Sequence, residues 1–288
     1  MAISSDIKSI LIERLGTDKV KLSPVGGGSI NETFQLQTPH ASFFVKCNNA
    51  SKFPHLFKSE AYGLKTLKEK NIISIPNVID QFETNGYQVL LLEWIQEGKR
   101  IPTFWKHFGE QLARLHHEHS AHFGLDQDNY MGSVPQKNQY TKEWESFYIQ
   151  FRITPLLSMC VEKRLLTSRH IELFNNLFKK IGTIFNHEPP SLLHGDLWSG
   201  NFLCNQQHQP VLIDPAIYYG HRSVDLGMTT LFGGFHETFY DAYHYHFPLP
   251  PNYKEQWKVC NLYPLLIHLF LFGRSYLSSI ESTLQDFQ

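Results

Sequence analysis

The sequence predicts an α+β fold of two lobes: a small antiparallel β lobe with one or two helices over residues 1–96, and a larger, mostly helical lobe over residues 97–288. Two observations predict this division. Short alternating apolar runs dominate before residue 96, whereas apolar residues recur at helical spacing over most of the chain after it. Between them, the polar segment 96–102 is interrupted by Gly98 and Pro102, as is typical of a linker.

The elements of the first lobe follow from these patterns and from turn residues. An Asn85-Gly86 pair predicts a hairpin turn, and a glycine run joins two of the earlier strands. We expect three or four antiparallel strands crossed by one helix. The predicted elements are a helix over 3–15, extended runs at 20–25, 33–38 and 43–47, a helix over 56–70, and strands at 78–82 and 87–94.

The second lobe is predicted to be helical except for one hairpin. Two short apolar runs, 200–204 and 210–213, favour that hairpin. The predicted helices cover 104–118, 141–159, 168–186, 224–232 and 254–282.

The composition excludes several classes of protein. Hydrophobic residues make up 42% of the 288 residues and charged residues 18%, which is too apolar for a disordered chain. The formal net charge is -1, so no overall positive field attracts nucleic acid or an anionic membrane. We therefore expect a folded protein without nucleic-acid or membrane partners, and its oligomeric state stays open.

The sequence also favours a cytoplasmic location. Residues 1–15 contain two acidic side chains and lack the basic start and apolar run of a signal peptide. The longest apolar stretch, 262–272, is interrupted by Pro264 and His268 and is shorter than the ~18 residues that span a bilayer. The four cysteines form no C-x-x-C motif, which favours reduced thiols over disulfides or a zinc site.

The most informative motif runs from His194 to Asn201 and is followed by Asp214. It matches H-x-D-L-x-x-x-N, the catalytic-loop pattern of kinases, at every position. Phosphoryl transfer from ATP needs a base for the acceptor hydroxyl and oxygen ligands for Mg²⁺. Asp196, Asn201 and Asp214 supply these groups, which makes a role in capping a turn the weaker interpretation.

Two upstream features agree with ATP binding. Lys46 ends an apolar strand, and Glu60 lies on the following helix. We predict an ion pair between them, with Glu69 as the competing partner, because phosphoryl transfer in kinases uses a strand lysine tied to a helix glutamate. A glycine-rich turn between the two preceding strands can approach phosphates through its backbone, although it matches G-x-G-x-x-G only in part. This turn contains Gly26, Gly27, Gly28 and Ser29.

Other residues indicate where adenine binds and which class of acceptor is disfavoured. Kinases bind adenine against backbone groups at the lobe junction, where Glu93, Trp94 and Ile95 lie, and the Glu93 side chain need not take part. Only ten residues separate Asp214 from Asp225 and no A-P-E follows, which disfavours protein phosphorylation.

Two residues near the catalytic motif have less direct interpretations. Trp198 offers a flat face to a sugar ring or packs beneath the loop, and the sequence leaves both open. Asp225 is interpreted as a structural brace for the catalytic loop rather than a reacting group.

These residues resemble the fructosamine-3-kinase (ketosamine kinase) family, which is related to aminoglycoside phosphotransferases and choline kinases. The resemblance covers nearly the whole chain, and the segments 123–136 and 214–235 look particular to ketosamine kinases. The matching segments are Phe44-Val-Lys46-Cys, Phe123 to Gln136, Trp144 to Arg152, His194 to Asn201, Asp214-Pro-Ala, Tyr218 to Arg222 and Leu231 to Phe235.

The resemblance implies a protein-kinase-like fold and ATP- and Mg²⁺-dependent phosphorylation of the 3-hydroxyl of a ketosamine, a repair step for glycated amines or proteins. It implies that Asp196 accepts the proton and that Asn201 and Asp214 bind Mg²⁺. It further implies that Lys46 with Glu60 holds the α and β phosphates and that residues 93–95 meet adenine. Many family members have a cysteine in the glycine-rich loop, which this chain lacks.

Two other functions stay open from the sequence. A kinase for aminoglycosides or choline is disfavoured weakly, because residues 97–288 contain 18 Asp and Glu against 16 Lys and Arg, little excess to attract a polycation. A non-catalytic ATP-binding pseudokinase is disfavoured because every expected catalytic position is filled.

Overall fold

A computed structural model describes residues 5–26 and 30–288. Its contacts separate the chain into two compact units, residues 1–100 with 203–214 and residues 101–202 with 215–288, which we call the first and second units. Residues 203–214 were predicted in the C-terminal lobe, whereas these contacts group them with the N-terminal residues.

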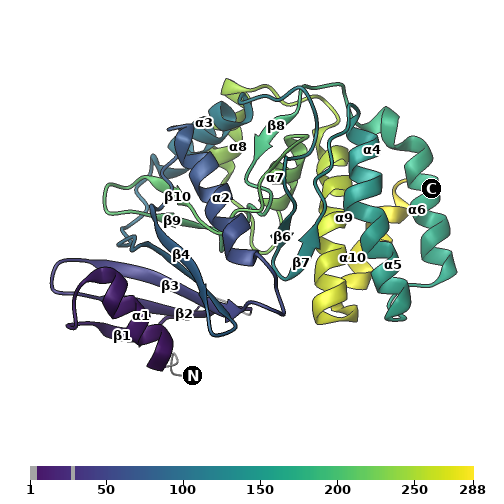
Figure 1. The fold of residues 1–288 in the computed structure, drawn as a ribbon. Helices are drawn as coiled ribbons and strands as arrows, with labels where there is room; N and C mark the ends of the chain where they lie inside the picture. Colours follow the sequence, from purple (N-terminus) through teal and green to yellow (C-terminus); the bar gives the residue numbers. More distant parts are fainter. Residues whose placement is uncertain (1–4, 27–29) are drawn as a thin grey trace. The chain divides into compact units, whose positions relative to one another are not determined.

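The first unit contains a five-stranded antiparallel sheet in the order β1-β2-β3-β5-β4 (Figure 1). This is one strand more than the expected upper number. Each predicted extended run forms one of the strands, and the Asn85-Gly86 turn joins the last two, both of its residues having positive φ. The strands are β1 (Lys21–Pro24), β2 (Glu32–Gln37), β3 (Ser42–Asn49), β4 (Val78–Thr84) and β5 (Tyr87–Glu93).

Two helices accompany this sheet, as predicted. Helix α1 (Ser5–Leu15) places Ile7 and Leu11 in a hydrophobic cluster with strand residues such as Val45. Helix α2 (Leu56–Glu69) contacts β4 and β5, and the backbone N–H of Phe57 donates to the buried side chain of Gln88. Burial of these apolar faces fixes the helices to the sheet.

The predicted hairpin forms as β9 (Phe202–Cys204) paired with β10 (Pro210–Leu212). Backbone hydrogen bonds tie it to N-terminal residues, from Gly98 N to Cys204 O at 2.7 Å and from Leu212 N to Ser74 O at 3.0 Å. Such long-range pairing explains why residues 203–214 group with the first unit, and the sequence contains no local signal for it.

The second unit is mainly helical, as predicted. Helices α3 (Phe104–His116) and α8 (Glu237–His246) pack closely where Gly109 faces the carbonyl oxygen of Phe239, a place too tight for any side chain. Its other elements are α4 (Trp144–Tyr148), a π-helical turn (Ile149–Ile153), α5 (Thr154–Glu162), α6 (Ser168–Ile184), α7 (Ser223–Met228), α9 (Tyr253–Phe272), a 3₁₀ turn (Arg274–Tyr276) and α10 (Leu277–Gln285).

Some elements differ from the prediction. The segment 254–282 is interrupted by Gly273, whose φ of 92° is unfavourable for other residues. Helix α8 was not predicted. Four of the three-residue strands were not predicted either, because such short strands show no resolvable period. These strands are β6 (Asn129–Met131) paired with β7 (Val134–Gln136), and β8 (Ser191–Leu193) paired with β11 (Tyr218–Gly220).

Helix α9 contains the longest apolar stretch and buries most of its side chains in the second unit. Within residues 5–26 and 30–288, no helix combines the length and apolar character needed to cross a membrane.

Candidate active site

In the first unit, Lys46 on β3 forms two ion pairs. Its Nζ lies 2.7 Å from Oε1 of Glu60 on α2 and 2.7 Å from Oδ1 of Asp214, which follows β10. The lysine side chain is only 3% exposed and that of Glu60 10%. The predicted Lys46–Glu60 pair is therefore present, and Glu69 is not a partner of Lys46 in the structure.

Burial and charge act in opposite directions on this group. Burial lowers the pKa of Lys46, but the carboxylates of Asp214 and Glu60 outweigh it and raise the pKa above its ordinary value. For Glu60, burial raises the pKa to about 7, against the opposing effect of Lys46. Lys46 is thus a buried, protonated group at neutral pH whose charge is balanced by two carboxylates.

Asp214 is the exposed member of this group. Its side chain is 44% exposed, and its φ of 56° lies in the left-handed region that non-glycine residues rarely adopt. Such conformations cost ~1–3 kcal/mol and cluster at functional sites. This backbone turns the carboxylate at the end of β10 toward Lys46.

The glycine-rich turn is described in part. Gly26 is exposed, and no atom lies within 4 Å of the place where a side chain would begin. The remaining predicted members, Gly27, Gly28 and Ser29, lie outside the described residues. After them, the side chain of Asn31 accepts a hydrogen bond of 2.6 Å from Asn48 on β3.

Residues 93–95 follow the end of β5. The Glu93 carboxylate accepts hydrogen bonds from the backbone and side-chain nitrogens of Asn77 at 3.0 and 2.6 Å. Its side chain is therefore engaged in structure, and so is its backbone N–H, which donates to the backbone oxygen of Asn77 at 2.9 Å. Trp94 packs near Phe44 with ring centroids 6.3 Å apart, and both Trp94 and Ile95 are half-buried.

In the second unit, Asp196 and Asn201 are paired within one loop after β8. The Nδ2 of Asn201 donates to the backbone oxygen of Asp196 at 2.8 Å and to its Oδ2 at 3.0 Å. This orients the carboxylate and leaves the amide oxygen Oδ1 of Asn201 outside the pair. The loop motif is thus a local structure, which is why its spacing could be read from the sequence.

Asp225 braces this loop from α7, as predicted. Its carboxylate accepts hydrogen bonds from the backbone nitrogens of His194 at 2.7 Å and Gly195 at 2.8 Å. Gly195 has a φ of 83°, and a side chain there would collide with the carbonyl oxygen of Ala216. Glycine at this position is therefore a steric requirement of the loop.

A buried polar network, which was not predicted, also supports the loop of residues 194–201. The backbone N–H of Ala216 donates to the oxygen of His194 at 2.8 Å. Gln136 donates to the oxygen of Ala216 at 3.3 Å and to Asn129 at 2.8 Å, while Asn129 donates to the oxygen of Ile217 at 2.7 Å. The hairpin β6–β7 thus holds residues 216 and 217, which flank the loop of residues 194–201 through the bond to His194.

The network ends on Arg152, which is fully buried. Its guanidinium donates to Asn138 Oδ1 and to the backbone oxygen of Lys137, both at 2.6 Å, and stacks 4.0 Å from the ring centre of Tyr218. No carboxylate of a described residue pairs with it. The sequence signal was the place of this arginine at the end of the family-matching segment Trp144 to Arg152, which does not indicate its partners.

Trp198 lies two residues after Asp196 and is half-buried. Its six-membered ring lies so close to Gly200 that a side chain there would collide with it, and its ring packs edge-on against Phe232 at 5.9 Å. The indole therefore has a fixed orientation, and the contacts leave part of it exposed.

Two of the predicted residues carry oxygen donors of the kind that Mg²⁺ prefers. Asn201 in the second unit offers an amide oxygen, and Asp214 in the first unit offers a carboxylate. In the part of the chain that the structure describes, no cluster of three or more His, Cys, Asp or Glu side chains is arranged to hold a metal ion.

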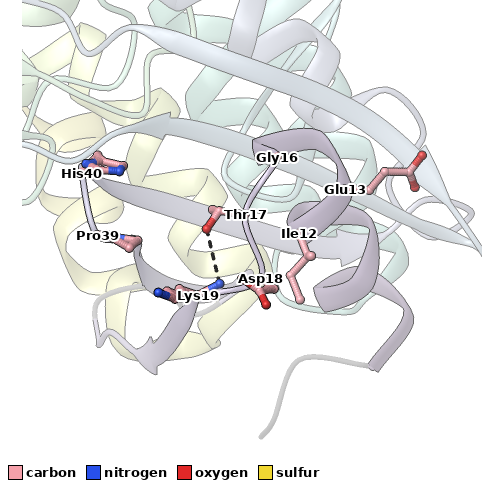
Figure 2. A pocket seen from close by; sticks show the side chains of 8 residues that line it. All are labelled: Ile12, Glu13, Gly16, Thr17, Asp18, Lys19, Pro39 and His40. Atoms are coloured by element: carbon pink, nitrogen blue, oxygen red, sulfur yellow. Dashed lines mark hydrogen bonds between the residues drawn. The ribbon is translucent and has the colours of Figure 1, made fainter.

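A separate groove of about 800 Å³ lies beside the end of α1 (Figure 2). It is lined by Ile12, Glu13, Gly16, Thr17, Asp18, Lys19, Pro39 and His40. None of the predicted site residues contributes to it.

Comparisons with known proteins agree with these features. The fructosamine kinase family model matches residues 3–288. A probable ketoamine kinase of Enterococcus faecium is 36% identical over 287 residues, covering 98% of this chain and 100% of that protein. The chloroplastic protein-ribulosamine 3-kinase of Arabidopsis thaliana is 36% identical over 283 residues, covering 96% of this chain and 86% of that protein.

Solved structures give the same result for the fold. A crystal structure assigned to fructosamine-3-kinase from Haemophilus somnus has a TM-score of 0.88 at 28% identity, covering 98% of this chain and 96% of that one. An aminoglycoside phosphotransferase crystallised with AMP-PNP and hygromycin B has a TM-score of 0.66 at 13% identity, covering 98% of each chain, and shows the fold alone. The predicted α+β, protein-kinase-like fold is confirmed. With a family model matched over residues 3–288 and curated relatives above 30% identity along almost its whole length, the chain belongs to the fructosamine kinase family.

Proposed function

We propose that the chain is an ATP-dependent kinase that phosphorylates the 3-hydroxyl of ketosamines, the fructosamine or ribulosamine adducts of amines or proteins. Family membership supports the substrate class. The observation that carries the reaction type is the Asp196–Asn201 pair, in a loop whose backbone is held by Asp225. A carboxylate held in this way is suited to act on a hydroxyl group.

In the proposed reaction, Asp196 accepts the proton of the acceptor hydroxyl while the hydroxyl oxygen attacks the γ-phosphorus of ATP. The bond from that phosphorus to the β–γ bridging oxygen breaks, and ADP leaves with the bond's electron pair. General-base catalysis of this kind contributes ~10²- to 10⁴-fold. Positioning supplies most of the remainder in phosphoryl transfer.

The other predicted residues have binding roles in this proposal. Lys46, anchored by Glu60, would hold the α and β phosphates, residues 26–29 would cover them, and residues 93–95 would meet adenine. Asn201 and Asp214 would hold Mg²⁺, which supplies charge neutralisation at the phosphates. Trp198 would offer its exposed face to the sugar.

We further propose that the reaction is a repair step in the cytoplasm. The phosphorylated ketosamine is unstable and sheds its sugar, which regenerates the amine. The four cysteines are all buried free thiols, in keeping with a reducing compartment.

The experiment that tests this function measures ATP consumption with Mg²⁺ over fructosyl-lysine, ribulosyl-lysine, kanamycin and choline. We expect turnover with the ketosamines only and a loss of about 10²-fold or more in Asp196→Asn. The matched control, Asp241→Asn, changes an exposed carboxylate on α8 and should keep wild-type activity. Full activity of Asp196→Asn would refute the assignment of the base, and turnover of kanamycin or choline alone would refute the substrate class.

A further inference from the structure

Beyond Trp198, the second unit carries a chain of aromatic side chains at its surface. Phe232 contacts Trp198 and lies 4.6 Å from the ring centre of His268, which in turn lies 5.5 Å from Phe272 and 5.0 Å from Tyr276. Phe232 is 37% exposed and Phe272 56%. In this row Phe232 and Phe272 are exposed and Trp198, His268 and Tyr276 are half-buried, whereas exposed apolar residues on a protein surface normally stand singly.

Phe232, one of the exposed rings, also has a strained backbone. Its φ is 53°, and the following Gly233 and Gly234 also have positive φ. A left-handed conformation costs a bulky residue ~1–2 kcal/mol, so asparagine or glycine would be the better choice on backbone grounds. Phenylalanine therefore bears a conformational cost and an exposed ring at the same position, as residues at binding sites often do.

This turn is tied directly to the loop of the proposed base. The hydroxyl of Ser199 donates to the backbone oxygen of Phe232 at 3.1 Å, and Ser199 lies three residues after Asp196. The rings thus continue from Trp198 to Phe232 in this turn and on to His268 and Phe272 of α9. An acceptor whose sugar lies on Trp198 would therefore have Phe232 as its aromatic neighbour, since the two ring centres are 5.9 Å apart.

We propose that Phe232, His268 and Phe272 form a stem-binding surface, which holds the apolar alkyl stem of the amine that carries the sugar. This inference rests on the proposed function. In a ketosamine built on a lysine side chain, a chain of methylenes follows the nitrogen, and aromatic faces pack well against such methylenes. The surface would make the enzyme prefer adducts of long-stem amines to adducts of short ones.

His268 is compatible with such a ligand. Burial lowers the pKa of His268, and its Nδ1 donates to the backbone oxygen of Pro264 at 2.8 Å. The ring is therefore neutral at pH 7 and places no positive charge beside the ammonium group of the acceptor.

The test compares kcat/KM for fructosyl-methylamine and for Nα-acetyl-fructosyl-lysine in wild type and in Phe232→Asn, since asparagine tolerates the left-handed backbone. We expect a loss of about tenfold or more for the lysine adduct. For the methylamine adduct we expect a loss of about threefold at most, with the KM for ATP unchanged in both cases. Phe272→Ala should show the same selectivity with a smaller loss.

The control is Tyr245→Ala, which removes an 81% exposed ring on α8 of the same unit. It should leave kcat/KM unchanged for both adducts. Equal losses on the two adducts, or no loss on the lysine adduct, would overturn the stem-binding surface. A wild-type protein that phosphorylates neither adduct would instead refute the proposed function, so the two failures are distinguishable.

Discussion

The imidazole of His116 and the carboxylate of Asp225 meet at 3.2 Å in the interior of the second unit, where neither side chain is exposed. Burial lowers the pKa of His116, so the ring is neutral at pH 7. Since the carboxylate only accepts, Nε2 carries the proton and Nδ1 accepts from the hydroxyl of Tyr243 at 2.8 Å. Asp225 thus receives hydrogen bonds from this ring and from the two backbone amides that precede Asp196.

Replacing Asp225 should therefore affect both stability and catalysis. In Asp225→Asn, the side-chain NH₂ would face a backbone N–H, leaving a buried donor without a partner. We expect the free energy of unfolding in urea to fall by about 2–4 kcal/mol. We also expect kcat to fall about tenfold or more as the loop loosens, since small misplacements of reacting groups are costly.

Asp241→Asn is the matched control, because it changes an exposed carboxylate in the same unit. Wild-type stability in Asp225→Asn would contradict the bracing role.

The Lys46–Glu60 pair allows a test that separates two glutamates of one helix. Glu60→Gln removes the carboxylate that anchors Lys46, whereas Glu69→Gln changes an exposed residue at the far end of α2. Because the lysine then keeps only Asp214, we expect kcat/KM for ATP to fall about tenfold or more in Glu60→Gln. Glu69→Gln should match wild type. Comparable losses in both variants, measured by steady-state kinetics with varied ATP, would show that the pair has no part in ATP binding.

The local part of the site could be predicted from the sequence. Asp196 and Asn201 are five residues apart in one loop, and Lys46 and Glu60 lie on adjacent elements. In both pairs the spacing and the type of residue determine the contact. The bracing role of Asp225 could be inferred as well, because its place after the catalytic motif offered few other roles.

The supporting network could not be predicted in the same way. Gln136 reaches Ala216 across 80 residues of the chain and Asn129 reaches Ile217 across 88, and no period or motif marks such pairs. The strain at Phe232 was equally hidden, because positive φ in a non-glycine residue depends on tertiary contacts that oppose local preference.

His221 gives the protein a pH-dependent stability. Burial lowers its pKa from 6.5 to about 4, and its Nδ1 accepts from the backbone N–H of Ser223 at 3.3 Å, which requires the unprotonated nitrogen. Above pH 6.5 the ring is neutral in both folded and unfolded chains. As the pH falls from 6.5 toward 4, the unfolded chain binds a proton that the folded chain does not. The free energy of unfolding then decreases, by up to about 3 kcal/mol.

The measurement compares wild type with His221→Gln by urea denaturation at several pH values. Loss of ring packing against Trp144 and Phe185 lowers the variant's stability by an amount independent of pH. The difference between the two proteins should therefore shrink between pH 6.5 and 4. Glu60, whose raised pKa gives the opposite slope, is present in both and cancels. A constant difference across this range would show that His221 does not titrate as stated.

The charge of Arg152 is buried without a carboxylate partner among the described residues. What holds it is geometry: two guanidinium nitrogens reach two oxygens at 2.6 Å while the flat group stacks on Tyr218. Lysine keeps the charge but has neither the planar fork nor the stacking face. We therefore expect Arg152→Lys to lower the free energy of unfolding by about 2–4 kcal/mol.

Catalysis should respond as well, since Arg152 fixes Asn138, Asn138 donates to Asn129 at 3.0 Å, and Asn129 holds Ile217, next to the residue bonded to His194. A looser segment here lowers kcat more than it raises the KM for ATP, because the loop of Asp196 loses support. Arg169→Lys, an exposed change at the start of α6, is the control. If Arg152→Lys retained wild-type stability and kcat, the charge alone would suffice and the planar geometry would be irrelevant to the loop.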